Sequence, residues 1–201
     1  QQTLFASNSP ELENVIFIEY KVTNTGLVSD VLDSIYFSPT DDTDIGDALD
    51  DLGGCDTLFQ SSFTFNAPDD QVYGNNPPAV FTTLLQGPVV ESQNPDDTAF
   101  LRNGEIVGEE IFPGHKNLAL YSFTGYAKSY ASQGDPQNVQ HVWNYVHAKD
   151  RQGNMLNPCD TLLGKVYGNI DCNEINNMFW FSGDPVSKVG WLDNRAMDDR
   201  K

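Results

Sequence analysis

The sequence predicts a mainly β protein, an antiparallel β-sandwich with long ordered loops and one surface α-helix. Two observations predict this class. Short segments rich in β-branched and aromatic residues recur along the 201 residues, and clusters of Gly, Pro, Asn and Asp separate them at short intervals. In addition, only one segment has a clear helical periodicity, so strands do not alternate with helices as in a parallel sheet. We expect a single β-sandwich-like domain over residues 1–201.

The strands are predicted from their side chains and from the turn residues that follow them. The first, VIFIEYKVT at 15–23, is rich in β-branched and aromatic residues and is followed by Asn24-Thr25-Gly26. TLFQSSFTF at 57–65 shows the alternation of a half-buried strand. The remaining predicted strands are 31–37, 80–85, 106–112, 119–126 and 178–182.

The predicted helix runs from about 136 to 150. Asp135 can cap its first turn and Pro136 suits its first position. Its apolar residues, Val139, Val142, Trp143 and Val146, follow the i, i+3, i+4, i+7 spacing of one helix face. Two long polar loops, 66–79 and 91–105, exceed the usual length of a connection, which indicates that something orders them.

The charge balance limits the possible partners. The chain carries 11 Lys and Arg against 29 Asp and Glu, for a formal net charge of −18. Nucleic acids and anionic membranes both require clustered basic residues, so we expect neither as a partner. No apolar run reaches the length of a spanning helix, so membrane insertion is not expected. Gln1 does not open a signal peptide, so we expect a removed leader or a fragment of a longer multidomain protein.

The three cysteines suggest one disulfide. Cys159 and Cys172 enclose a 12-residue loop and can pair if the chain is exported. Cys55 would then be a small buried apolar group. A site made by the three thiols is less favoured, because the sequence contains no C-x-x-C pair.

An aspartate-rich segment at 41–56 is the strongest indication of a ligand. Seven of its sixteen residues are Asp, and so many carboxylates repel one another unless a cation offsets them. Calcium takes six to eight oxygen ligands, which alternating Asp residues and a Gly bend can supply. The predicted ligands are Asp42, Asp44 and Asp47, with Asp50, Asp51 or Asp56 completing the shell and the carbonyl of Ile45 joining it.

Two other interpretations of this segment stay open. The acids can form a solvated loop held by Asx-turns, or Asp47 can cap one helical turn that contains Ala48, Leu49 and Leu52. The segment is not an EF-hand. Counted from Asp42, the sixth and twelfth positions hold Asp47 and Gly53 where that loop needs Gly and Glu.

Catalytic motifs are scarce. The sequence lacks a G-x-S-x-G elbow, an H-E-x-x-H zinc motif and a phosphate-binding loop. His141 and His147 stand six positions apart and therefore on different helix faces. A pair of carboxylates for polymer hydrolysis remains an alternative. Tyr121, Tyr126 and Trp191 form a possible ligand platform for sugars.

Several strings resemble one module of large secreted proteins. These strings are FIEYKVTNTG (17–26), DTDIGDALDDLGGCDT (42–57), NNPPAV (75–80), LLQGP (84–88), FSGDPV (181–186) and GWLDN (190–194). Those proteins resemble cargo of the type IX secretion system, with a C-terminal sorting domain and often fibronectin-like domains. The resemblance runs from about Val15 to Arg200 and implies an extracellular location and a modular context, but no reaction.

Together these features predict a non-enzymatic, calcium-stabilised structural or assembly module of a secreted or cell-surface protein. Its expected partners are neighbouring domains of the same protein or other surface proteins. A carbohydrate-binding or adhesive module, with glycans as ligands, is one alternative. A hydrolase that acts on an extracellular polymer is the other.

Overall fold

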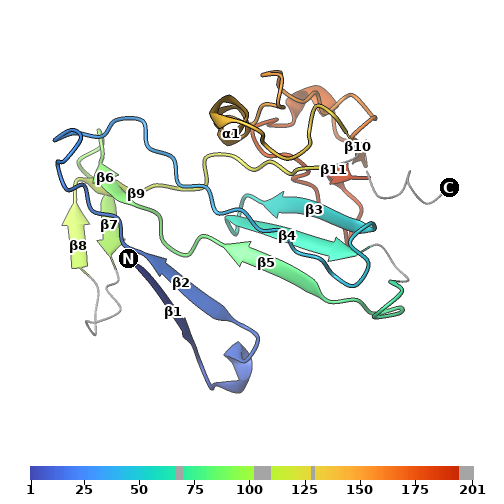
Figure 1. The fold of residues 1–201 in the computed structure, drawn as a ribbon, viewed down its shortest axis with the longest axis horizontal. Coiled ribbons are helices and arrows are strands. Elements are labelled where there is room, and N and C mark those ends of the chain that lie inside the picture. The colour runs from blue at the N-terminus through green and yellow to red at the C-terminus, as the bar shows by residue number, and fades with distance from the viewer. Residues whose placement is uncertain (67–69, 102–109, 128–129, 195–201) are drawn as a thin grey trace. The chain divides into compact units, whose positions relative to one another are not determined.

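The computed structural model describes residues 1–66, 70–101, 110–127 and 130–194 (Figure 1). The chain divides into two compact units, Gln1–Pro39 and Thr40–Lys201, where the sequence analysis expected one domain. Each unit is therefore described by itself.

The first unit is built on a hairpin. Strands β1 (Gln2–Ala6) and β2 (Ile16–Tyr20) pair antiparallel, and a short 3-10 helix, η1 (Pro10–Leu12), lies between them in the chain. Phe5 stacks on its cross-strand partner Phe17 with ring centroids 5.0 Å apart. β2 confirms the strand predicted at 15–23.

The strand predicted at 31–37 is wrong. No strand is assigned to these residues, although all of them are described. Ser34, in the middle of the segment, has φ of 57°, which interrupts an extended backbone. Apolar composition alone therefore did not produce a paired strand here.

The second unit contains the largest sheet. Strands β3 (Asp51–Asp56), β4 (Ser61–Asn66) and β5 (Ala79–Thr83) form an antiparallel sheet in chain order (Figure 1). The register places Asp51 opposite Asn66 at one end and Asp56 opposite Ser61 at the other. β4 and β5 fall inside or next to the strands predicted at 57–65 and 80–85. Residues 51–56 form a strand, so the interpretation of the whole aspartate-rich segment 41–56 as a loop is wrong.

The described part of this unit also contains three two-stranded sheets. β6 (Val89–Glu91) pairs with β9 (His115–Asn117), β7 (Thr98–Leu101) with β8 (Glu110–Pro113), and β10 (Gly164–Tyr167) with β11 (Gly190–Asp193). β8 overlaps the strand predicted at 106–112, of which 106–109 lie outside the described residues. The predicted strands 119–126 and 178–182 meet only at the Phe123–Phe179 bridge. Phe181, with φ of 55°, interrupts the second of them.

The predicted helix is present but shorter. Helix α1 spans Val139–Val146 instead of 136–150. The cap is Asn138, whose side-chain oxygen accepts the backbone N–H of His141 at 2.9 Å, and not Asp135. At the other end Ala148 adopts φ of 56°, a left-handed conformation that ends a helix. Val139 is 84% exposed, as expected of a surface helix.

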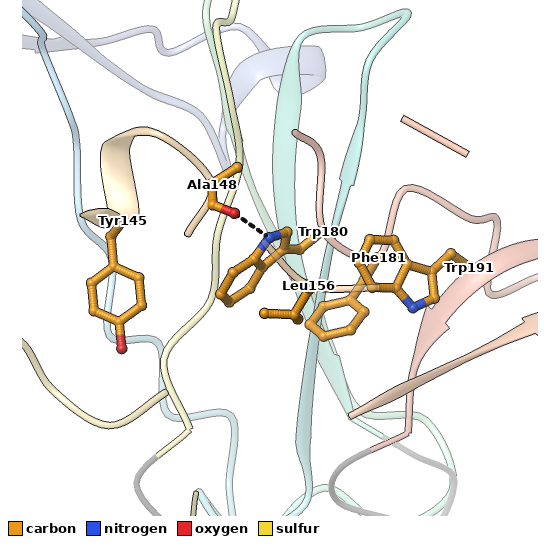
Figure 2. Packing of buried hydrophobic residues seen from close by; sticks show 6 residues of the cluster. All are labelled: Tyr145, Ala148, Leu156, Trp180, Phe181 and Trp191. Atoms are coloured by element: carbon orange, nitrogen blue, oxygen red, sulfur yellow. Dashed lines mark hydrogen bonds between the residues drawn. The ribbon is translucent and has the colours of Figure 1, made fainter. Parts of the chain in front are cut away.

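The hydrophobic core of the second unit lies between α1 and the C-terminal strands. Its buried members are Tyr145, Ala148, Leu156, Trp180, Phe181 and Trp191 (Figure 2). Trp180 is fully buried, and its indole N–H donates to the carbonyl of Ala148 at 3.2 Å. Phe181 contacts Trp191 edge to face with ring centroids 5.3 Å apart.

The mainly β prediction, with antiparallel strands and one helix, is confirmed. The strands of the described residues are distributed over five small sheets of two or three strands, a finer division than the two large sheets of a sandwich. Within the described part of the chain, no helix has the length and apolar character needed to cross a bilayer.

Candidate metal centre

The start of β3 lies beside the end of β4 (Figure 1). Acidic and amide side chains gather there. Asp50 and Asp51 stand at the start of β3. Asn66, the last residue of β4, is the cross-strand partner of Asp51. Asp70 follows Asn66 closely in the chain, and the turn at 45–47 precedes β3. We call Asp50, Asp51, Asn66 and Asp70 the acidic cluster.

Asp70 is the most enclosed carboxylate of the cluster, with 3% of the residue exposed. It accepts the backbone N–H of Asp47 at 2.9 Å, of Val72 at 2.8 Å and of Tyr73 at 2.5 Å. The N–H groups of Asp47 and Tyr73 hold the pKa of Asp70 below its ordinary value, because they stabilise the charged form. Asp70 therefore remains ionised and ties the turn at 45–47 to the turn at 70–74.

Asn66 links two carboxylates. Its side-chain nitrogen donates to Oδ1 of Asp50 and, at 3.2 Å, to Oδ2 of Asp70. The residue is only 7% exposed. Its side-chain oxygen, Oδ1, is buried and has no hydrogen-bond partner among the described residues. The amide nitrogen therefore faces the two carboxylates, and the oxygen at the other end of the amide has no described partner.

Asp51 also has an unsatisfied oxygen. Its Oδ2 accepts the backbone N–H of Ile45 at 3.0 Å, whereas its buried Oδ1 has no partner in the described ranges. Burial raises the pKa of Asp51, and repulsion from Asp50, Asp44 and Asp70 raises it further. Negative charge at this position is thus poorly compensated by the protein alone.

Glycine is required at position 46. Gly46 has φ of +68°, in the left-handed region that favours glycine. A Cβ atom at this position would lie 2.3 Å from both carboxylate oxygens of Asp70. The turn can therefore approach the acidic cluster only because residue 46 has no side chain.

The structure brings together part of the predicted ligand set. Asp50 and Asp51 belong to the acidic cluster. Asp44 lies close enough to raise the pKa of Asp51. The backbone N–H of Ile45 donates to Asp51, and that of Asp47 donates to Asp70. The side chain of Asp47 accepts the N–H of Leu49 at 3.1 Å, in the manner of a turn cap. Asp42 is exposed.

Asp56 is wrong as a ligand. It lies at the far end of β3 from Asp51, and five residues of extended strand span roughly 16 Å. Its carboxylate instead accepts the N–H groups of Leu58 at 2.8 Å and Phe59 at 3.0 Å, which begins the turn into β4.

Asn66 and Asp70 were missed by the sequence analysis. They belong to a different segment from 41–56, and only the register of β3 against β4 brings them to the cluster. A signal existed, since the run Asn-x-x-Asp-Asp follows the strand predicted at 57–65. Among the residues that the structure describes, no group of three or more His, Cys, Asp or Glu side chains has converged to hold a metal ion.

The predicted ligand platform is not assembled. Trp191 is only 2% exposed and belongs to the core, because it packs against Phe181, so its prediction as a platform residue is wrong. Tyr126 is partly buried against Tyr145, with ring centroids 4.5 Å apart. Tyr121 is 50% exposed and meets the ring of His147 edge to face at 6.0 Å. His147 in turn lies 4.5 Å from the ring of Trp143, which is 46% exposed.

The cysteines are arranged as the sequence suggested. Cys159 and Cys172 form a disulfide, and Cys55 is a buried free thiol. Burial raises the pKa of Cys55 to about 12, and its Sγ contacts the carbonyl oxygen of Trp180 at 3.5 Å. Cys55 is therefore an unreactive packing group at neutral pH.

A small cavity of about 260 Å³ lies beside the disulfide loop. Asp150, Leu156, Asp160 and Trp191 are among its lining residues. Its two carboxylates already hold turns: Asp150 accepts the N–H groups of Gln152 and Asn154, both at 2.9 Å, and Asp160 accepts that of Leu162 at 3.0 Å. These contacts are those of turn-capping aspartates.

Comparisons of the chain with family models, with curated proteins and with solved structures found no match. The resemblance to type IX secretion cargo therefore stays a prediction.

Proposed function

We propose that this chain is a non-enzymatic structural or assembly module of a secreted or cell-surface protein. The Cys159–Cys172 disulfide is the observation that carries the proposal. Disulfides persist in oxidising, extracellular compartments and are rare in the reducing cytosol. The bridge closes a loop that contributes Asp160, Leu162 and Leu163 to the wall of the cavity. The disulfide therefore constrains a folded part of the second unit.

The rest of the chain is consistent with this role. Cys55, the remaining cysteine, is buried beside Trp180 and protected from oxidation. Most of the described aspartates with resolved contacts hold turns, as Asp56, Asp150 and Asp160 do. Loops ordered in this way suit a rigid spacer or docking module, and its partners would be neighbouring domains or other surface proteins.

A carbohydrate-binding or adhesive role is the second candidate, favoured by the exposed aromatic group. Tyr121, Trp143 and His147 lie together on the surface of the second unit. Exposed aromatic rings bury large apolar areas on a ligand at low entropic cost. A glycan array probed with the wild type and with Trp143→Ala tests this role. Binding that the substitution abolishes would establish it, and an array without binding would remove it.

The location of the protein in its source cells tests the main proposal. Intact cells are treated with a membrane-impermeant biotinylation reagent, and the protein is then recovered from the cells and from the medium. We expect biotinylated or released protein in which Cys159 and Cys172 are protected from alkylation until reduction. Protein confined to the cytosol, with all three cysteines reduced, would contradict the proposal.

A further inference from the structure

We propose that the outer edge of β1 pairs antiparallel with β1 of a second copy of this chain. The two hairpins then form one four-stranded sheet in which the two copies of β1 (Gln2–Ala6) are the central strands. The inference rests on the proposed function in one respect, since it names a partner for the assembly role. That partner is another copy of the same module.

The first unit has no buried core of its own. All of residues 1–39 are described, and none of them is buried. Their sheet has only the two strands β1 and β2. A two-stranded hairpin is at best marginally stable in water, whereas a sheet of three or more strands with a hydrophobic face can be stable by itself. The hairpin therefore needs a further strand beside it.

One face of the hairpin is apolar and exposed. Cross-strand partners lie on the same face of a sheet, and Leu4 is paired with Ile18. Leu4 is 60% exposed and Ile18 is 51% exposed. Ala6 and Ile16 form the next pair on this face. A strand added beside β1 would cover part of Leu4 and would extend the apolar face sideways.

The outer edge of β1 is open. Gln1 and Lys21 exchange both backbone hydrogen bonds, at 2.8 and 2.9 Å. In an antiparallel ladder such pairs alternate with pairs that are not hydrogen-bonded. The alternation turns the backbone N–H and C=O groups of Gln2, Leu4 and Ala6 away from β2. Among the described residues no third strand pairs with β1, and an edge of this kind is a template for another strand.

The distribution of charge selects β1 as the edge at which two copies meet. The net charge of −18 makes two copies of the chain repel each other. β1 contains neither a charged residue nor Pro, which are the usual protection of an edge strand. β2 contains Glu19 and is followed by Lys21. Two copies can therefore approach along β1 without placing like charges opposite each other.

The register of β1 with itself is also complementary. A two-fold axis beside Leu4 places this residue opposite Leu4 of the second copy, and Gln2 opposite Ala6. These are the residues whose backbone groups point outward, so each pair can exchange two hydrogen bonds. The axis is perpendicular to the sheet, and the apolar face therefore continues across all four strands. The contact is isologous and closes at two copies.

Sedimentation equilibrium of the full chain tests the dimer. The seam is smaller than a standard interface, so we expect a dissociation constant of about 10–100 μM for the wild type. Leu4→Pro removes an outward N–H and leaves the hydrogen bonds to β2 in place. This variant should dimerise about tenfold more weakly or worse. Ile18→Pro is the matched control, since it removes the equivalent N–H on the outer edge of β2, and it should dimerise like the wild type.

A crosslink tests the register, even if Leu4→Pro folds poorly. Opposite residues of a hydrogen-bonded pair have Cα atoms about 5.5 Å apart, within the range of a disulfide. Cys159 and Cys172 are bridged and Cys55 is buried, so Leu4→Cys adds an accessible thiol to a chain whose own cysteines are protected. Mild oxidation should link Leu4→Cys into a dimer, whereas Ile18→Cys should stay unlinked.

The outcomes distinguish this inference from the proposed function. A wild type that remains monomeric at about 1 mM, a dimer that Leu4→Pro leaves unchanged, or equal crosslinking of the two cysteine variants would overturn the inference. A monomer found at the cell surface would leave the proposed function standing. A dimer with the expected crosslink in a protein confined to the cytosol would support the inference and contradict the proposed function.

Discussion

Gly46 lies directly against the carboxylate of Asp70. A Cβ on Gly46 would fall 2.3 Å from each of the two oxygens, and the residue has φ of +68°. Asp70 also accepts the backbone N–H of the next residue, Asp47, at 2.9 Å. The close approach of Gly46 to Asp70 and this hydrogen bond therefore depend on each other. The turn before β3 therefore docks on the acidic cluster through a position that admits only glycine.

Gly46→Ala should consequently destabilise the protein more than a comparable glycine elsewhere. Gly114→Ala is the control, since Gly114 has φ of +70° and a Cβ added there would meet no atom within 4 Å beyond its chain neighbours. We expect a loss of about 1 kcal/mol for the control, from backbone strain, and about 2–4 kcal/mol for Gly46→Ala, from strain plus displacement of Asp70. Urea unfolding of both variants measures the difference. Equal losses would mean that the Asp70 contact contributes nothing.

Trp180→Phe tests the core. Trp180 is fully buried and donates to the carbonyl of Ala148, so the variant loses ring volume and leaves that acceptor unsatisfied. We expect a loss of about 2–4 kcal/mol in the free energy of unfolding. Trp143→Phe, at a position 46% exposed on α1, should change it by less than about 0.5 kcal/mol. The account of the core would fail if both variants unfolded at the same urea concentration.

Stability should depend on the Cys55 thiol at alkaline pH. Burial raises the pKa of Cys55 from an ordinary value of 9.0 to about 12 in the folded protein. Between these values the folded state keeps the proton and the unfolded state loses it, so the thiol's contribution to stability is complete below pH 9 and falls as the pH rises.

The comparison of the wild type with Cys55→Ala isolates this effect. The wild type should be the more stable protein at pH 8, and its advantage should shrink by about 1.4 kcal/mol at pH 10, which is one unit above the unfolded pKa. Unfolding in urea at both pH values measures the advantage. An advantage that is independent of pH would show that Cys55 ionises in the folded state as easily as in the unfolded state.

Removal of the disulfide should lower stability without rearranging the core. Cys159 and Cys172 are separated by 13 positions, and closing a loop of this size stabilises a fold by about 3 kcal/mol in the chain-entropy model. The double variant Cys159→Ser/Cys172→Ser should lose about this amount, while the near-ultraviolet circular dichroism of Trp180 and Trp191 is retained. A variant with wild-type stability would indicate a bridge that constrains little.

The composition and periodicity of a single segment were enough to predict two of the elements. β5 and α1 follow from β-branched composition and from helical periodicity, and both are present near the predicted bounds. The helix ends were less predictable, because Asp135 and Asn138 are both capable caps and only the contact with His141 distinguishes them. The segment 31–37 has the composition of a strand, but Ser34 is left-handed and no strand pairs with the segment among the described residues.

The acidic cluster was predictable only in part. The run of aspartates identified Asp50 and Asp51, but its polar composition hid the strand β3 that begins there. Asn66 and Asp70 enter the cluster through the pairing of β3 with β4, a long-range relation that composition does not encode. Trp191 was misassigned for a similar reason, since its burial depends on the packing of β11 against Phe181.

Peptide mapping of the protein recovered from the surface of intact source cells, alkylated before and after reduction, is the decisive measurement for the extracellular proposal. We expect a linked pair of peptides that contain Cys159 and Cys172, with Cys55 in the thiol form. A protein recovered only from the cytosol, with Cys159 and Cys172 both alkylated before reduction, would contradict the proposal.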